Sequence, residues 1–168
     1  MPATEMRDLL LHELGDILYA ERKFLSGTKT MAREVKSPEM KARLEEHVRE
    51  TEGQIERIQE VFKVLGEKAK AEKCEAAIGL REEHDSFKSE EKPSKPILEA
   101  FDLGSGLRIE HYEIAAYRTA IAIAKAMGEK ECLPLLEESL REEEEMAKFL
   151  EKNAVPAIKK LMAQMEAE

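Results

Sequence analysis

The chain has 168 residues, of which 38 % are charged and 42 % hydrophobic, and its formal net charge is −9. This length is typical of one domain with a sizeable core, and the acidic charge disfavours nucleic acid as a partner while suiting metal cations. The abundance of Ala, Glu, Lys and Leu favours long helices over sheet. The sequence therefore predicts a single all-α domain over residues 1–168.

The apolar runs and the cysteines indicate the cellular compartment of the protein. No apolar run is as long as a membrane span, and the first residues (M-P-A-T-E) lack the features of a signal peptide. Cys74 and Cys132 do not have the spacing of a metal knuckle or a redox motif. We therefore expect a cytoplasmic protein without a membrane partner, with reduced cysteines as the default and a single disulfide as the alternative.

Two long helices are predicted in the first part of the chain. The first begins at Thr4, a good N-cap, and ends near Val35. The second begins at Pro38, with Ser37 as its N-cap, and ends at Gly66. The short turn between them makes the two helices antiparallel neighbours.

Polar residues interrupt the apolar stripe of each of these helices. Glu21 stands where a Leu is expected in the first helix. In the second helix, His47 and Glu50 lie in the middle of a stripe whose two ends are apolar. Because a carboxylate that faces a core is costly unless it is paired or binds a metal, these positions require a partner.

The connection over about residues 66–95 breaks the helical pattern. It contains a short predicted helix over about residues 72–86 and a polar segment over residues 88–95. Because the connection is too long for a tight turn, we expect it to cross over along the length of a bundle.

The third long helix is predicted from Pro96 to Gly128. Gly104 and Gly106 weaken its first part and mark either a kink or a close approach of another helix. Its apolar stripe includes Glu110 and Glu113, so two carboxylates again face the expected core.

The fourth long helix is predicted to follow at once, over about residues 129–152, with Glu143 in its apolar stripe. Asn153 and Pro156 interrupt it, and a short amphipathic C-terminal helix over about residues 156–166 is expected beyond them. Short, long and short connections give two antiparallel hairpins joined by a crossover, which is the ferritin-like arrangement of a four-helix bundle.

Counting from the turns places the carboxylates at one level. Glu21 and Glu50 stand 15 residues before and 14 after a turn near residue 36, and Glu113 and Glu143 stand 15 before and after a turn near residue 128. At about 1.5 Å per residue, each lies roughly 22 Å from its turn. Because the crossover puts the two turns at opposite ends, the four carboxylates are expected to meet at mid-height.

The expected cluster suits a pair of divalent metal ions. Four carboxylates neutralise two such ions, and oxygen ligands with an imidazole suit iron first and manganese second, whereas the absence of thiolates disfavours structural zinc. Glu110 is either a ligand or a partner that orients His47. The candidate metal ligands are Glu21, His47, Glu50, Glu110, Glu113 and Glu143.

Several segments carry a resemblance to a known family. They are L-Y-A-E (18–21), H-V-R-E-T-E-G-Q-I-E-R-I (47–58), C-E-A-A-I-G-L (74–80), I-E-H-Y-E-I-A-A-Y (109–117) and L-R-E-E-E (140–144). With these segments the chain resembles the YciE/YciF family of ferritin-like proteins over most of residues 5–153. The resemblance implies a ferritin-like bundle that is often dimeric, a di-metal centre and an association with stress responses.

The chain departs from better-known ferritin-like enzymes in its histidines. Those enzymes place a His three residues after a Glu on the second and fourth helices, whereas here Gly53 and Met146 occupy these positions and His47 precedes Glu50. The expected site is therefore rich in carboxylates and poor in histidine, which raises the case for manganese.

Two function hypotheses follow. In the first, the protein binds two iron or manganese ions and oxidises Fe(II) with O₂ or peroxide during stress, which makes it a candidate ferroxidase or peroxidase. Glu21 and Glu113 are then terminal ligands, Glu50 and Glu143 bridging ligands, and His47 a nitrogen donor. In the second, it is a non-catalytic homodimeric stress protein whose metal site is structural or absent.

Overall fold

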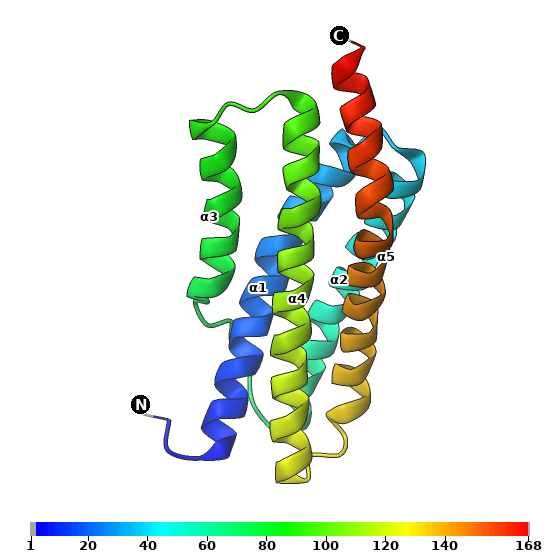
Figure 1. The fold of residues 1–168 in the computed structure, drawn as a ribbon. Helices are drawn as coiled ribbons and strands as arrows, with labels where there is room; N and C mark the ends of the chain where they lie inside the picture. Colours follow the sequence, from blue (N-terminus) through cyan, green and yellow to red (C-terminus); the bar gives the residue numbers. More distant parts are fainter. Residues whose placement is uncertain (1–2, 168) are drawn as a thin grey trace.

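The computed structural model describes residues 3–167, which fold into five α helices without a strand among them. The helices are α1 (Met6–Glu34), α2 (Pro38–Val64), α3 (Glu75–Glu90), α4 (Lys95–Met127) and α5 (Leu133–Glu166). Helices α1, α2, α4 and α5 form an elongated bundle, and α3 packs on its outside against α1 and α4 (Figure 1). The prediction of an all-α bundle is confirmed.

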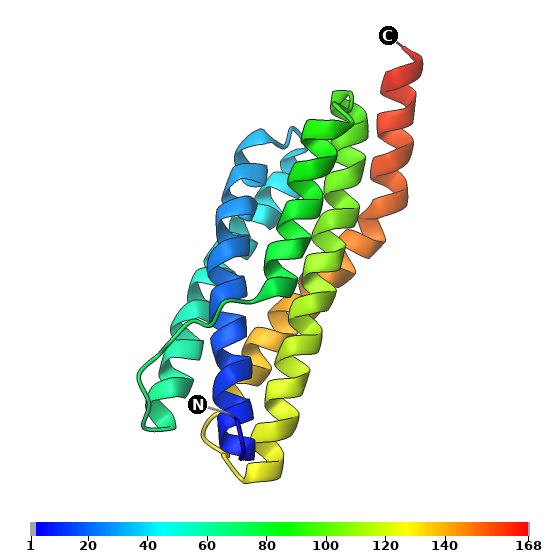
Figure 2. The ribbon, with the colours of Figure 1, turned by 90° about the vertical axis from the view of Figure 1, so that its left-hand side faces the viewer.

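The path of the chain places its two tight turns at opposite ends of the bundle (Figure 1). Helix α1 runs away from the end near the N-terminus and α2 returns, after which a loop and α3 lead back along the outside (Figure 2). Helix α4 then runs in the direction of α2, and α5 runs back beside it. Residues in the middle of the four long helices therefore lie at one level.

Local signals explain where the helices begin and end. Helix α1 starts slightly later than predicted, because Glu5 is its N-cap and forms a reciprocal capping box with Asp8. At α2 the Ser37 side chain accepts a hydrogen bond from the backbone of Met40 at 3.5 Å. Gly128 ends α4 in the left-handed region at φ 79°, which glycine adopts without steric cost.

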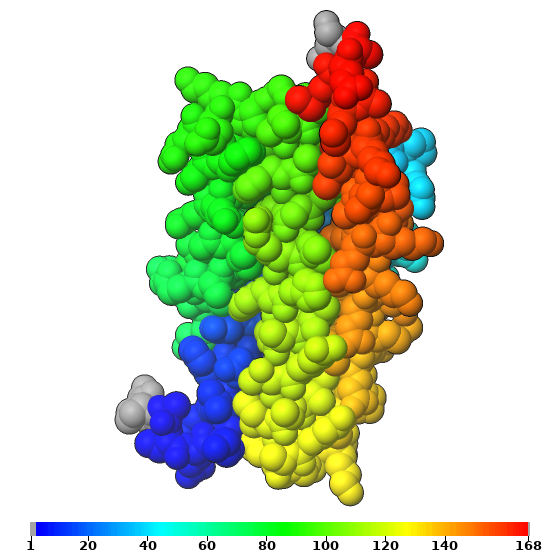
Figure 3. All heavy atoms as spheres, in the orientation of Figure 1, coloured from blue at the N-terminus to red at the C-terminus, as the bar shows by residue number. Residues whose placement is uncertain are grey.

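Helix α5 differs from the prediction. The expected interruption at Asn153 and Pro156, and with it a separate short helix over residues 156–166, is wrong, because α5 is continuous from Leu133 to Glu166. The Asn153 side chain donates to the carbonyl of Phe149 at 2.9 Å within the helix. The last turns of α5 project beyond the other helices (Figure 3).

Two further differences concern α3 and the glycines of α4. Helix α3 begins and ends a few residues later than expected, with buried Cys74 as its N-cap. Helix α4 passes through Gly104 and Gly106 without a break. A Cβ on Gly106 would lie 3.5 Å from Leu150 Cδ1, which is an ordinary van der Waals distance, so the packing of α5 does not require this glycine.

Apolar side chains form two core clusters inside the bundle. One surrounds Leu14, Ile58, Tyr117 and Leu136, near the turn between α4 and α5. The other contains Ala32, Leu44, Met146 and Leu150, toward the turn between α1 and α2. Between these clusters lies a layer of buried polar side chains, which we call the polar layer and which contains Glu21, His47, Gln54, Glu110, Glu113 and Glu143. The other buried polar residues are Thr28, Thr51, Ser105 and Ser139.

The structure shows the environment of both cysteines and the apolar character of the helices. Cys74 and Cys132 are both buried and free, so the alternative of a disulfide between them is not realised. The Cys74 Sγ atom lies 2.9 Å from the Tyr112 hydroxyl. None of the helices in residues 3–167 combines the length and the apolar character that a membrane span requires.

Candidate metal centre

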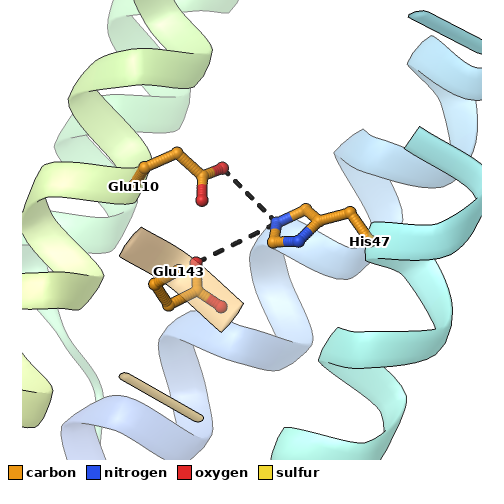
Figure 4. Close-up of side chains that lie close together, drawn as sticks. All are labelled: His47, Glu110 and Glu143. Carbon is orange, nitrogen blue, oxygen red and sulfur yellow. Dashed lines mark ion pairs between the residues drawn. The ribbon is translucent and has the colours of Figure 1, made fainter. Parts of the chain in front are cut away.

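Three of the predicted ligands converge in the polar layer from three different helices (Figure 4). His47 Nε2, from α2, lies 3.4 Å from Glu110 Oε1 of α4 and 4.0 Å from Glu143 Oε2 of α5. One ligand atom from each residue lies within 4.8 Å of the others. The exposed fractions are 4 % for His47, 4 % for Glu110 and 0 % for Glu143. This buried group could hold a metal ion.

Glu21 and Glu113 lie in the same layer and are also buried. The Tyr117 hydroxyl, from α4, donates to Glu21 Oε1 of α1 at 2.5 Å. Burial raises the pKa of Glu21 to about 8, although this hydrogen bond acts in the opposite direction. Burial raises the pKa of Glu113 as well, and the charge of neighbouring Glu21 raises it further.

Glu50 has a different environment from the other predicted ligands. Its Oε2 atom lies 2.7 Å from Arg43 Nη1 and 3.2 Å from His47 Nδ1, the ring nitrogen that does not face Glu110. Burial alone would raise the pKa of Glu50, but the hydrogen bonds from His47 and Arg43 outweigh it and lower that pKa. The structure therefore places Glu50 where it orients the imidazole, outside the group of three.

Four of these carboxylates have an oxygen without a partner. Within residues 3–167, Glu21 Oε2, Glu110 Oε2, Glu113 Oε1 and Glu143 Oε2 are buried and make no hydrogen bond. Buried acceptors of this kind are costly and rare in folded proteins. A divalent cation would satisfy them, and oxygen ligands with one imidazole match the preference of iron and manganese. The donor set thus fits the predicted metals.

Protonation is the way in which the metal-free layer limits its negative charge. Burial raises the pKa of Glu143, and the charge of Glu110 raises it further. Burial alone would lower the pKa of His47, but the charges of Glu110 and Glu143 outweigh it, so that pKa is raised. A cation that binds here must displace protons from these groups.

The comparisons with known proteins agree over nearly the whole chain. Residues 5–163 match the family described as a domain of unknown function, DUF892. Protein YciF of Escherichia coli is 33 % identical over 145 residues, which are 85 % of this chain and 86 % of that protein. The chain belongs to the DUF892 family. The predicted resemblance to YciF is therefore confirmed.

The fold of this DUF892 protein is similar to the folds of solved structures. The crystal structure of the E. coli stress protein YciF matches with a TM-score of 0.85 and 30 % identity, over 94 % of this chain and 99 % of that chain. The structure of YcfI from Rhodopseudomonas palustris matches with a TM-score of 0.83 and 36 % identity, over 88 % and 94 % of the two chains. The ferritin-like fold class expected from the sequence is confirmed.

In this DUF892 protein, Glu143 is held by a hydrogen-bond network whose other members the sequence analysis did not identify as functional residues. Gln54, fully buried on α2, donates to Glu143 Oε1 and also lies 3.0 Å from Glu142 Oε2. Arg57 donates to Glu142 and, through Nε at 3.0 Å, to Ser139. The Glu142 side chain is therefore mostly buried, at 12 % exposure. The available signal was the position of Gln54 within the inward stripe of α2.

Proposed function

We propose that the protein is a di-metal carboxylate protein that binds two iron or manganese ions in its polar layer. It oxidises Fe(II), or reduces O₂ or peroxide, as part of a stress defence. The observation that carries this proposal is a set of four buried carboxylates that share the polar layer with a single imidazole. Each of the four has one oxygen without a hydrogen-bond partner within the described residues. E. coli YciF, to which the chain is similar, is described as a stress protein.

The contacts in the polar layer support separate roles for the residues that bind metal and the residues that orient them. His47, Glu110 and Glu143 hold one ion, and Glu21 and Glu113 contribute carboxylates to the other. Iron or manganese bound here would supply the electrons for reduction of O₂ or peroxide. Glu50, held by Arg43, orients His47, and Gln54 orients Glu143.

The residues around the layer control water and protons. The apolar cluster around Leu14, Ile58, Tyr117 and Leu136 limits the access of bulk water from the side of the turn between α4 and α5. The hydrogen bond from Tyr117 holds Glu21 Oε1 and leaves Oε2 free for a cation. The carboxyls with raised pKa values release protons as a cation binds, so uptake of metal is coupled to loss of protons.

The proposal is tested by anaerobic titration of Fe(II) into Glu143→Gln, with Glu144→Gln as a matched control. Glu144 is the next residue on α5, but its side chain is 44 % exposed and pairs with Arg118. We expect the wild type and Glu144→Gln to bind about two ions per chain, and Glu143→Gln to bind fewer and to lose O₂ consumption.

Equal Fe(II) content in both variants would contradict the proposal. It would favour the alternative of a non-catalytic stress protein whose polar layer is structural. The predicted homodimer and the cytoplasmic location are proposals that sedimentation analysis and cell fractionation would examine.

A further inference from the structure

A large cavity opens beside the candidate metal centre. Its volume is about 1120 Å³, which exceeds the upper end of ordinary small-molecule sites. The cavity runs from the turn between α1 and α2 inward between α4 and α5, at the end of the bundle where the tip of α5 projects (Figure 1). Along α4 its lining extends from Lys95 inward to Glu110, and along α2 it extends inward to His47. His47 and Glu110, two of the group of three predicted ligands, therefore line its inner end.

The walls of the cavity are apolar, and its outer part carries charges of both signs. The wall residues are Met31, Leu44, Leu103, Met146, Phe149 and Leu150. The charged residues that line this outer part are Glu34, Lys36, Glu39, Lys95, Glu99, Asp102 and Lys160. Methionine side chains adapt to ligands of different shape, and the mixed charges select neither an anion nor a cation. The lining thus suits an uncharged molecule with an extended apolar body.

Two poor helix formers line this cavity within otherwise regular helices. Gly106 lies in the interior of α4, and Pro156 lies in the interior of α5. A Cβ on Gly106 would meet Leu150 Cδ1 at an ordinary van der Waals distance of 3.5 Å, so a longer side chain would have to enter the cavity. Gly106 has no side chain to occupy the cavity, although most other residues would stabilise α4 more at this position.

The polar end of the cavity has one free acceptor. Glu110 is 4 % exposed, and its Oε2 atom is buried without a hydrogen-bond partner in residues 3–167. In the metal-free protein, a hydroxyl group at the end of an apolar ligand could donate to this oxygen, whereas a carboxylate end group would bring a second negative charge to it.

We propose that this cavity binds an uncharged organic molecule with an extended apolar body and a terminal hydroxyl group, such as a long-chain alcohol. The hydroxyl group lies at the inner end beside Glu110 and His47, and the chain lies along the wall formed by α4 and α5. As the substrate class of the metal centre, this inference rests on the proposed function, but binding itself does not require a metal.

Calorimetric titration of decanol into the metal-free protein tests the inference. The wild type should bind decanol saturably and more tightly than decanoate. Gly106→Leu should weaken decanol binding by at least about tenfold, because its side chain would occupy the part of the cavity one helical turn from Glu110. Gly104→Leu is the matched control, since Gly104 is exposed, lies two residues away on α4 and does not line the cavity.

A second variant protects the test against misfolding. Leu103→Phe also reduces the cavity, and Ile123→Phe is its control, because Ile123 is partly buried on α4 but packs on the other core cluster. Circular dichroism and thermal unfolding establish that each variant folds. Binding of decanol to Gly106→Leu or Leu103→Phe as tight as to the wild type would overturn the inference.

Metal binding, measured on the same preparations, separates this inference from the proposed function. Normal Fe(II) binding without decanol binding would overturn the inference alone, and decanol binding without Fe(II) binding would contradict the proposed function alone. If a second copy of the chain covers the cavity, Gly106→Leu would break a dimer in sedimentation and the wild type would not bind decanol. That result would also overturn the inference.

Discussion

Among single residues, Glu50 and Glu143 differ in how their charge is compensated. Glu50 receives hydrogen bonds from Arg43 and His47, which lower its pKa. Glu143 receives one from Gln54, while burial and the charge of Glu110 raise its pKa. Glu50, which accepts hydrogen bonds from two cationic groups, is held as an ion, whereas Glu143, with His47 only at 4.0 Å, favours a proton or a metal.

Tyr117→Phe tests the hydrogen bond that orients Glu21. Loss of the hydroxyl leaves both oxygens of a buried carboxyl without a partner, so the free energy of unfolding of the metal-free protein should fall by roughly 1–3 kcal/mol. Urea denaturation measures this change. Tyr19→Phe is the control, because Tyr19 is only partly buried and its hydroxyl makes no hydrogen bond within the described residues. Equal effects of the two substitutions would contradict the assigned role.

The sequence predicted which residues are buried better than it predicted their partners. Glu21, His47 and Glu143 were identified because a polar residue within an apolar helical stripe is a local signal. The turn of Glu50 toward Arg43 and the reach of Tyr117 to α1 depend on side-chain directions, which helical spacing does not determine. Gln54 was assigned no role because an uncharged amide in a stripe is a weaker signal than a carboxylate.

At the level of helices, the ends were predictable and the interruption was not. Gly66 and Gly128 both adopt positive φ and end their helices as expected. Pro156 lacks only one backbone donor, and α5 continues beyond it while Leu161 buries itself on the bundle. Tertiary packing thus overrode the local signal, which a single sequence does not reveal.

Gly128→Ala and Gly104→Ala should change stability in opposite directions. Gly128 has φ 79°, so alanine there should lower the free energy of unfolding by about 1 kcal/mol. Gly104 is exposed inside α4, so alanine there should raise it by about 0.5–1 kcal/mol. Urea denaturation of both variants measures the difference. A stabilising effect of Gly128→Ala would mean that α4 does not end in this left-handed conformation.

For the whole molecule, the inversion of the two hairpins is what gathers the site. The turns lie at opposite ends of the bundle (Figure 1), so residues at equal distances from their turns lie at the same height. Counting residues from the turns therefore predicted that Glu21, Glu113 and Glu143 share one level, and all three are buried. The cavity that reaches this layer was not predictable, because it depends on how α4 and α5 pack near Gly106.

The stability of the metal-free protein should fall as pH rises from about 5 to about 8. The pKa of Glu21 is about 8 in the folded chain and 4.5 ordinarily, so the folded state retains a proton that the unfolded chain has lost across this range. The raised pKa of His47 acts in the same direction, and the lowered pKa of Glu50 acts below this range. Urea denaturation at several pH values measures the trend.

Bound metal should reverse this trend, because the carboxyls lose their protons as pH rises and the apparent affinity for a cation increases. Addition of Mn(II) should therefore raise the midpoint of urea unfolding more at pH 8 than at pH 6. A stability that rises with pH without metal would be incompatible with buried carboxyls whose pKa values are raised.

Anomalous diffraction from crystals loaded with Mn(II) tests the central claim most directly, because it locates the metal. We predict anomalous peaks in the polar layer, bound by His47, Glu110 and Glu143, with Glu21 and Glu113 at the neighbouring position. Peaks confined to carboxylates on the surface, with none in this layer, would contradict the account of the protein as a di-metal carboxylate bundle.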